Sequence, residues 1–468
     1  MEAAIIAGAV RLGSRRAVDV VREALDRAEK AEHLGAFTQL HPEHAMDRAA
    51  HIDAQVAAGE NPGRLAGVPI AIKDNIAHAG MPLRAASRML DGYIAPRTAT
   101  ALARLEAEGA VVIGRTNMDE FGMGSSGENS ASGPTLNPVN TAHVPGGSSS
   151  GSAAAVAAGI VPLSLGSDTG GSVRQPASFC GVVGLKPTYG RISRSGLLAF
   201  GSSLDQIGPL ARSVRDVAIA THIMAGEDPL DSTTLHAQMG SMEAERNPDL
   251  SGCTVGLPEE CWRESDQGPV HQTVRAAIAQ LEELGATVQR VQIPSLQAAI
   301  PTYYLLTSAE AASNLSRFDG IRYGPRASSD DLIDTYTQTR TEGFGPEVQR
   351  RILLGTFALA EGWADDLYRR ANAVRARMRA EIDQALSGID ALMMPTAPST
   401  AFRLGEKTTD PIQMYLSDIF TTPPSLTGHP ALSVPAGSLD GLPVGAQIVT
   451  RHEDEATALR LGMAINGR

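Results

Sequence analysis

The chain has few cysteines, few lysines and few aromatic residues for its 468 residues. Its three cysteines, at 180, 253 and 261, form no CxxC pair, so they indicate neither a zinc site nor a disulfide scaffold. The longest apolar stretch, residues 153–165, is too short and too interrupted to span a bilayer. The net charge of -12 argues against a chain that grips nucleic acid by itself, because phosphate binding needs a basic surface. We therefore expect a cytoplasmic, metal-free protein.

Lysine is the scarcest of the charged residues, at positions 30, 73, 186 and 407 only, although the chain has 40 basic residues. Lys73 ends the apolar, strand-like run 68–72 and is followed by turn-forming Asp74 and Asn75. Arginine cannot lose its proton in a protein, whereas lysine can. The position of Lys73 therefore predicts a base, although a lone lysine at a strand end is more often a surface residue.

Two glycine–serine clusters, residues 146–148 and 170–172, flank a stretch rich in alanine and valine. Glycines at such positions let one backbone approach another where any Cβ would clash. They also free neighbouring N–H groups to point at a ligand, which is how an oxyanion hole is built. The two clusters therefore predict the floor of a catalytic site with a serine nucleophile.

Other interpretations of these glycines are weaker. A flexible linker is disfavoured because residues 152–160 have the pattern of a buried helix. A phosphate-binding loop would need a GxxxxGK[ST] motif, which is absent. The run 147–151 matches the GxSxG elbow of esterases, but no strand precedes it and its base would be a distant histidine such as His429 or His452. The GxGxxG match at 122–127 is not followed by a helix pattern.

Three motifs resemble, in order and spacing, the signature of the amidase signature family: IKDNI around Lys73, GGSSSGSAAAVAAG, and GSDTGGSVRQPASFCG. The resemblance implies that Ser172 is the acyl-enzyme nucleophile. It implies that Ser148 is a bridging serine that the family holds with a cis peptide bond, and that Lys73 is the general base. The backbone N–H groups of the oxyanion hole would come from Thr169, Gly170 and Gly171.

The chemistry of amide hydrolysis is consistent with these roles. An amide needs an activated hydroxyl, stabilisation of the tetrahedral oxyanion, and protonation of the departing nitrogen. Lysine at its reference pKa of about 10.4 is almost fully protonated at neutral pH, so burial must lower the pKa of Lys73. Ser148, between lysine and nucleophile, could then pass the proton in both directions.

Three later segments, beginning at Tyr303, Glu342 and Asp410, resemble the A subunits of the glutamyl-tRNA(Gln)/aspartyl-tRNA(Asn) amidotransferases, a branch of the same family. Glutamine is the ammonia donor in that branch. The resemblance implies that Arg351 holds the α-carboxylate of glutamine and Asp418 its α-ammonium, with Tyr303 lining the site. Taken alone, Arg351 has the pattern of a helix-surface arginine and Asp418 that of a helix or turn cap.

This resemblance also implies partners. Ammonia released here would be used by the B and C subunits to amidate Glu-tRNA(Gln) or Asp-tRNA(Asn), with ATP and Mg used by the partner, which would also hold the misacylated tRNA. The chain itself would need no cofactor. An obligate assembly would leave apolar surface exposed on the isolated chain. A stand-alone amidase for another small amide and a non-catalytic scaffold are the alternatives, and the chain departs from the family pattern at Ser150, Trp363 and His429.

The order of elements predicts an α/β fold with a large mixed twisted sheet covered by helices on both faces. We expect a single amidase signature domain over 1–468, with the catalytic signature core at 58–225 and a helix-rich, substrate-facing subregion at 303–387. The most plausible internal division is the polar segment 226–251. Helices are expected over 17–30, 98–108, 152–158, 214–224, 270–284 and 456–465. Strands are expected over 68–72, 110–113, 161–165, 254–257, 287–293, 391–394 and 444–449.

Overall fold

The computed structural model describes residues 2–236, 249–263, 268–362 and 364–467. Its strands are β1 (Phe37–Leu40), β2 (Val68–Lys73), β3 (Ala110–Thr116), β4 (Leu163–Asp168), β5 (Val183–Lys186), β6 (Gln206–Ala211), β7 (Thr254–Pro258), β8 (Thr287–Val291), β9 (Ala391–Pro395), β10 (Ala431–Leu439) and β11 (Leu442–Thr450). Within the described ranges they form one 11-stranded sheet in the order β1-β3-β2-β4-β6-β5-β10-β11-β9-β7-β8. The prediction of a large mixed sheet is confirmed.

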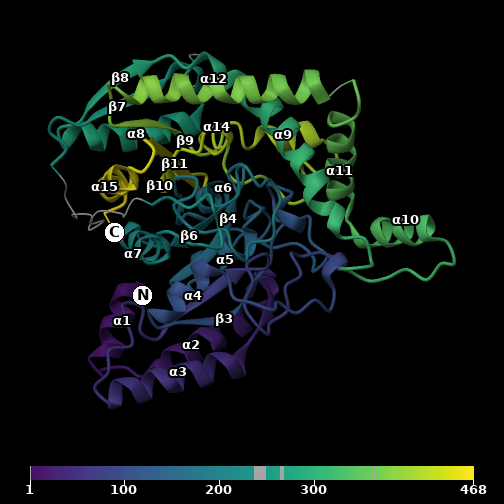
Figure 1. Ribbon diagram of the computed structural model, residues 1–468. Coiled ribbons are helices and arrows are strands. Elements are labelled where there is room, and N and C mark those ends of the chain that lie inside the picture. Colours follow the sequence, from purple (N-terminus) through teal and green to yellow (C-terminus); the bar gives the residue numbers. More distant parts are fainter. Residues whose placement is uncertain (1, 237–248, 264–267, 363, 468) are drawn as a thin grey trace.

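The α-helices surround this sheet (Figure 1). They are α1 (Ala3–Arg11), α2 (Ala17–Lys30), α3 (Pro42–Ala57), α4 (Thr100–Ala107), α5 (Ser150–Ala157), α6 (Arg174–Cys180), α7 (Val214–Met224), α8 (Pro269–Glu283), α9 (Ala299–Asn314), α10 (Leu332–Gly343), α11 (Pro346–Ala358), α12 (Arg369–Leu386), α13 (Pro411–Leu416), α14 (Thr422–Thr427) and α15 (Glu455–Asn466). Figure 1 shows α1–α3 at one end of the molecule, α12 at the other, and α10 projecting from the side. None of the helices in the described ranges combines the length and apolar character that a membrane span requires.

Helices cover both faces of the sheet, and β10 shows how. A Cβ added to Gly462 of α15 would lie 3.2 Å from Val434 of β10. Ser433, which precedes Val434 in β10, points to the other face of the sheet. A Cβ on Gly445 of β11 would lie 3.0 Å from the Ser433 hydroxyl and 2.5 Å from the hydroxyl of Ser178 in α6. Successive side chains of a strand point to opposite faces. Helices α6 and α15 therefore pack on opposite faces, as predicted.

Three adjacent strands bring the site residues to one edge of the sheet. β2 pairs in parallel with both β3 and β4, and all three strands are buried along their whole length. Such strands have almost continuous apolar sequences because helices cover both of their faces. Lys73 is the last residue of β2, and Asp168 is the last of β4. Neighbouring parallel strands end at the same edge, so these two side chains enter one region.

The predicted elements are confirmed with small shifts at their ends. Helices α2 and α7 have the predicted bounds, whereas α5 begins at 150 and β4 runs over 163–168. Strand β10 was not predicted, because its Pro435 and Gly437 are unfavourable in a strand interior. In the structure, the pairing of β10 with β11 shifts register between Pro435 and Gly437. Such an irregularity in the strand pairing tolerates proline.

The division expected at 226–251 includes residues 237–248, which lie outside the described ranges. Strand β7 follows this segment and pairs with β8 and β9, while β9 pairs with β11. The strands after the segment thus belong to the same sheet as those before it. The region 303–387 contains α10, α11, α12 and most of α9.

Candidate active site

Lys73 lies fully buried among serine oxygens. Its Nζ is 2.8 Å from Ser148 Oγ, 2.9 Å from Ser149 Oγ, 2.9 Å from Ser167 Oγ and 3.2 Å from the Ser167 carbonyl. Ser148 and Ser149 immediately precede α5, and Ser167 belongs to β4. The cis peptide bond expected at Ser148 is present, and it joins Gly147 to Ser148. The structure therefore brings two of the three predicted catalytic side chains into direct contact.

Of the three serines around Lys73, Ser148 is the one whose hydroxyl makes no other hydrogen bond within the described residues. The hydroxyl of Ser149 donates to the Ser167 carbonyl at 3.1 Å. Ser167 Oγ accepts the side-chain amide of Asn75 at 2.9 Å. Among the described residues, Ser148 Oγ has Lys73 as its only hydrogen-bond partner. When Lys73 is neutral, the hydroxyl of Ser148 can therefore donate to the lysine nitrogen.

The surroundings of Lys73 favour its neutral form. Burial lowers the pKa of Lys73 from 10.5 to about 7, against the opposing effects of the carboxylates of Asp119, Asp168 and Asp205. A lysine with a pKa near 7 is about half neutral at neutral pH. Such a group can both accept a proton and return it, which general acid–base catalysis requires.

Ser172 lies in the turn between β4 and α6, beside this pair. Its carbonyl accepts the backbone N–H of Ser149 at 3.1 Å, which places it next to the segment that carries Ser148. Its side chain is 8% exposed, and its Oγ has no hydrogen-bond partner within the described residues. A nearly buried hydroxyl without a structural hydrogen bond is consistent with the predicted role of nucleophile.

The turn that carries Ser172 is held by a buried ion pair. Asp168 accepts the N–H groups of Gly171 at 2.9 Å and Val173 at 3.1 Å. Its two oxygens also accept Nη2 and Nε of Arg174 at 2.9 Å and 3.0 Å. Both charged side chains are fully buried. This charge-assisted bidentate pairing fixes the turn in one conformation.

Both glycines before Ser172 are required by close contacts. A Cβ on Gly170 would lie 2.6 Å from the ring of Tyr303. A Cβ on Gly171, where φ is +141°, would lie 2.1 Å from the hydroxyl of Thr421. Tyr303, predicted to line the site, thus packs directly on the catalytic turn.

The amides of this turn differ in what they contact. The N–H of Gly171, predicted as an oxyanion donor, is committed to Asp168 in this structure. Within the described residues, the N–H groups of Gly170 and Ser172 have no hydrogen-bond partner. Thr169 is held through its hydroxyl, which donates to Asp205 at 2.6 Å. The geometry therefore favours Gly170 and Ser172 over Gly171 as donors to an oxyanion.

Arg351 of α11 is not the surface residue that its local pattern suggests. It is only 3% exposed. Its guanidinium lies over two aromatic rings, 4.5 Å from the centre of Tyr304 and 4.9 Å from that of Tyr415. Its Nε donates to Glu347 at 2.7 Å. This aromatic cage with one carboxylate partner fixes the guanidinium and stabilises its charge away from water.

Asp418 lies between α13 and α14 and is 7% exposed. Its carbonyl accepts the N–H of Thr421 and Thr422, so its backbone caps the turn. Its carboxylate takes no part in this cap. Oδ2 accepts a hydrogen bond from the hydroxyl of Ser125, and Oδ1 is buried without a hydrogen-bond partner. Burial raises the pKa of Asp418 to about 7. A buried carboxylate oxygen without a partner is suited to bind a cation.

A chain of hydrogen bonds links Asp418 to the catalytic serines. The carbonyl of Ser125, whose hydroxyl contacts Asp418, accepts the amide of Gln175 at 2.8 Å. The carbonyl oxygen of the Gln175 side chain accepts the N–H of Gly147, next to Ser148, at 2.9 Å. The pKa of Tyr303 is raised, first by burial, and Arg351 and Asp418 both exert electrostatic effects on it. Tyr303 therefore lies in the field of both charged side chains.

Several residues that build this site were not predicted. They hold the catalytic and charged side chains in place: Asn75, Ser125, Ser149, Ser167, Asp168, Arg174, Gln175, Asp205 and Thr421. The three motifs quoted above contain six of them, so a signal was present for Asn75, Ser149, Ser167, Asp168, Arg174 and Gln175. Ser125, Asp205 and Thr421 lie outside those motifs.

Comparisons with known proteins agree with this geometry. The family model described as Amidase matches residues 19–459. The chain is 50% identical over 448 residues to the A subunit of glutamyl-tRNA(Gln) amidotransferase of Geobacillus thermodenitrificans, covering 95% of this chain and 92% of that protein. The crystal structure of the A subunit of glutamyl-tRNA(Gln) amidotransferase from Thermotoga maritima aligns with a TM-score of 0.80 at 42% identity, covering 96% of this chain and 91% of that one.

A peptide amidase from Stenotrophomonas maltophilia aligns with a TM-score of 0.84 at 31% identity, covering 99% of this chain and 96% of that one. Its backbone is thus as similar as that of the Thermotoga protein, although its sequence is less so. The shape of the fold alone therefore does not discriminate between substrates, and the choice depends on the residues around the nucleophile.

Proposed function

The chain belongs to the amidase family, and on that premise we propose that it hydrolyses glutamine to glutamate and ammonia for a tRNA-dependent amidotransferase. The observation that carries the choice of substrate is the pair of buried opposite charges, Arg351 and the unpartnered oxygen of Asp418, around Tyr303. A zwitterionic amino acid presents one carboxylate and one ammonium, and burying them requires one fixed partner for each.

The first chemical step forms an ester on Ser172. Neutral Lys73 takes the proton of Ser148, and Ser148 takes the proton of Ser172 as Ser172 Oγ attacks the side-chain amide carbon of glutamine. The oxyanion receives hydrogen bonds from backbone N–H groups of the turn at 170–172. The protonated Lys73 then returns its proton through Ser148 to the departing nitrogen. The carbon–nitrogen bond breaks, and ammonia leaves.

The second step hydrolyses the ester by the same relay. Water attacks the ester carbonyl and gives a proton through Ser148 to Lys73. The bond to Ser172 Oγ breaks, Ser172 regains its proton from the relay, and glutamate is released. The four oxygens around Lys73 stabilise the ammonium form that exists briefly in each step.

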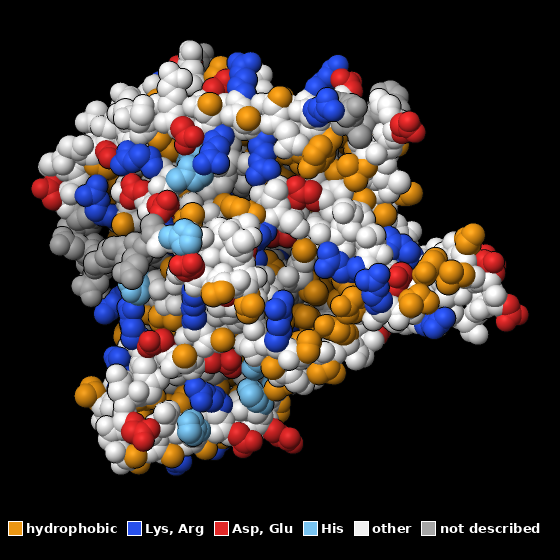
Figure 2. Space-filling view, viewed as in Figure 1, with side chains coloured by type: hydrophobic (Ala, Val, Ile, Leu, Met, Phe, Trp, Pro, Cys, Tyr) orange, Lys and Arg blue, Asp and Glu red, His pale blue; other side chains and the backbone are white. Residues whose placement is uncertain are grey.

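We propose that the ammonia passes to partner B and C subunits, which use ATP and Mg to amidate misacylated tRNA held by the partner in the cytoplasm. Two observations support partners. The relative of Geobacillus thermodenitrificans is one subunit of an amidotransferase by name. Large apolar side chains are exposed on the projecting helix α10 and on α11 (Figure 2), including Leu332, Ile333, Leu353 and Leu354. Soluble monomers seldom expose such patches.

The test is ammonia release from glutamine by the purified chain, alone and with the B and C subunits, ATP and charged tRNA. We expect release that rises with the partners and is abolished by Ser172→Ala. A chain that ignores glutamine but hydrolyses other small amides would be a stand-alone amidase, and one that forms no adduct at Ser172 with a serine-directed reagent would be a scaffold.

Asp418→Asn tests the choice of substrate separately. Losing a charge-assisted contact worth about 1.5–3 kcal/mol should raise the KM for glutamine by about 10-fold to 150-fold, with a smaller effect on kcat. The matched substrate is the glutamine analogue that lacks the α-amino group. Its turnover should change little in the variant. Equal losses on both substrates would contradict the assignment of Asp418 to the ammonium.

A further inference from the structure

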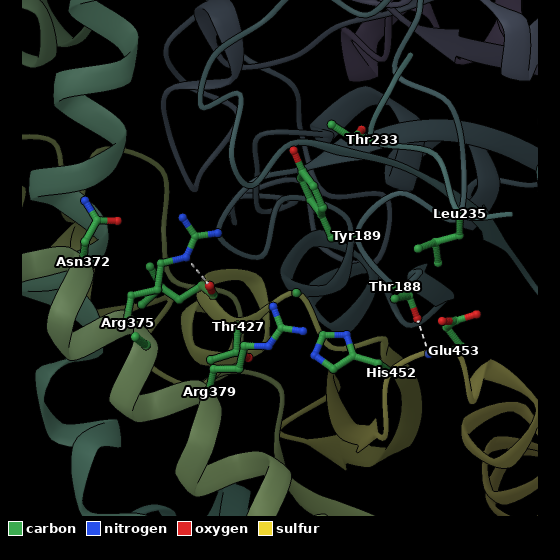
Figure 3. Close-up of a pocket in the computed structure, with 13 residues that line it drawn as sticks. Thr188, Tyr189, Thr233, Leu235, Asn372, Arg375, Arg379, Thr427, His452 and Glu453 are labelled. Atoms are coloured by element: carbon green, nitrogen blue, oxygen red, sulfur yellow. Dashed lines mark hydrogen bonds between the residues drawn. The ribbon is translucent and has the colours of Figure 1, made fainter. Parts of the chain in front are cut away.

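A second group of titratable side chains lies outside the active site, beside a cavity of about 550 Å³. Asp383 of α12, His429 between α14 and β10, and His452 after β11 present ligand atoms that all lie within 4.8 Å of one another. His452 and Arg379 line the cavity, and Figure 3 shows the guanidinium of Arg379 pointing toward the ring of His452. The mechanism above uses none of these side chains.

The position of His429 follows from the end of α14. Gly428 has a φ of +80° and ends the helix in the left-handed conformation that glycine adopts most easily. The turn directs His429 into the interior, where it is fully buried. Its Nδ1 lies 2.8 Å from the hydroxyl of Thr427, and its Nε2 lies 3.0 Å from Asp383 Oδ1.

The hydrogen bonds of Thr427 determine which nitrogen of His429 carries the proton. The hydroxyl of Thr427 donates to the carbonyl of Pro423 at 2.9 Å, so toward His429 it can only accept. His429 Nδ1 must therefore carry the hydrogen that it shares with Thr427. In the neutral ring, Nε2 then has a lone pair, and this lone pair faces a carboxylate oxygen at 3.0 Å. Two acceptors at that distance repel each other unless a cation lies between them.

A second imidazole, that of His452, lies beside His429 and Asp383. The neighbouring ring of His452 lies 4.0 Å away between centres. Its Nε2 is buried, has no hydrogen-bond partner, and lies 3.9 Å from Asp383 Oδ1. The lone pair of His429 Nε2, the carboxylate oxygen of Asp383 and the unpartnered Nε2 of His452 thus lie within 4.8 Å of one another.

We propose that His429 Nε2, His452 Nε2 and Asp383 Oδ1 bind a divalent cation of the zinc class beside this cavity. Two imidazoles and a carboxylate are ligands that zinc prefers, and in a tetrahedral site with bonds of about 2.0–2.1 Å the ligand atoms are about 3.3 Å apart. The separations of 3.0 Å and 3.9 Å bracket that value. The hydrogen bond from His429 Nδ1 to Thr427 orients the ring, as an outer partner of a metal ligand does. The fourth position would open toward the cavity.

Arg379 places a positive charge close to the proposed site, so its removal is a control that should strengthen cation binding. Its Nε is 3.7 Å from the second oxygen of Asp383. A positive charge at that distance weakens cation binding without occupying a ligand atom. Arg379→Gln should therefore increase metal affinity by several-fold. A ligand substitution should do the opposite.

The test is binding of Zn²⁺ and of the spectroscopic probe Co²⁺ to the full chain after treatment with a chelator. We expect one ion per chain, with the visible absorption of tetrahedral cobalt. Asp383→Asn, which alters a half-exposed side chain and should fold normally, should reduce the affinity by on the order of 100-fold. His452→Asn should do the same, while His51→Asn, at an exposed histidine, should leave binding unchanged.

Two results would overturn the proposal. One is binding that persists in Asp383→Asn and is lost in His78→Asn, because the ion would then occupy the other cluster of this kind in the described residues, His44, His78 and Glu106. The other is the absence of stoichiometric binding, in which case a nitrogen NMR signal of doubly protonated His429 is expected. A proton would then lie between His429 and Asp383.

Discussion

Two buried lysines end two strands of the same sheet, and their surroundings separate a base from a structural cation. Lys73 ends β2 and Lys186 ends β5, and both are almost completely buried. Burial lowers the pKa of each to about 7. Lys73 Nζ contacts three serine hydroxyls, whereas Lys186 Nζ donates to the carbonyl of Pro187 at 2.9 Å. A lowered pKa is therefore not enough to define a catalytic base.

The difference lies in the path for the proton. A hydroxyl can take a proton from one neighbour and give one to another, while a carbonyl can only accept. Lys73 faces such a hydroxyl in Ser148, and the backbone of the following residue, Ser149, is hydrogen-bonded to that of Ser172. Lys186 instead lies in the charge network behind the catalytic turn, where Arg174 lowers its pKa and Asp168 and Glu455 raise it. The two sites thus share burial and differ in function.

Replacing the base gives the largest expected effect. Lys73→Arg keeps a positive charge but cannot accept a proton, so glutamine hydrolysis should fall by on the order of 10³-fold or more. The measurement is kcat with saturating glutamine. Lys73→Met, which removes the charge, should be equally inactive, and circular dichroism should establish that both variants fold. A Lys73→Arg enzyme with a normal rate would contradict the comparison.

Breaking the relay gives the next largest effect. Ser148→Ala leaves Lys73 buried and deprotonatable but removes the hydroxyl that lies 2.8 Å from its Nζ and serves as the proposed relay to Ser172. Lys73 should then resemble Lys186, and kcat should fall by on the order of 10²-fold to 10³-fold. Ser150→Ala, in the same segment, is the matched control and should change kcat by less than a few-fold. Equal losses in the two variants would indicate a packing defect instead.

Removing one acceptor should have a smaller effect. Ser167→Ala deletes one of the four oxygens around Lys73 Nζ, at 2.9 Å. Hydrogen bonds to the charged form favour it, so their loss should lower the pKa of Lys73 and shift the acidic limb of the rate profile to lower pH. The ammonium formed during the reaction should also be less stable, which should lower kcat by about tenfold. An acidic limb that moves to higher pH would disprove this role.

The base and the catalytic turn could be predicted from the sequence, whereas the contacts between distant segments could not. The scarcity of lysine and the apolar run before Lys73 indicated a base, and the paired glycines indicated the catalytic turn. The commitment of Gly171 N–H to Asp168, the aromatic cage around Arg351 and the unpartnered oxygen of Asp418 arise from segments far apart in the chain. Local pattern describes one element at a time, so such contacts require the fold.

The smallest expected effect belongs to the second lysine. Lys186→Met should change kcat by no more than about twofold. Its effect should appear in stability: the pKa of Lys186 is about 7 in the folded chain against 10.5 for an unperturbed lysine, so between these values the unfolded chain binds more protons and the free energy of unfolding rises with pH. In the variant this rise should be less steep. Urea unfolding at pH 7.5 and 9.5 measures it, and an unchanged slope would refute the buried titration.

The most direct test is the pH dependence of kcat for glutamine hydrolysis, from pH 5.5 to 8.5 with saturating glutamine, in the wild type and in Lys186→Met. If Lys73 acts as a neutral base, kcat should rise with pH as one proton is lost, with an apparent pKa of about 7 in both proteins. A kcat that is independent of pH, or an apparent pKa that moves when Lys186 is removed, would contradict the assignment of Lys73 as the base.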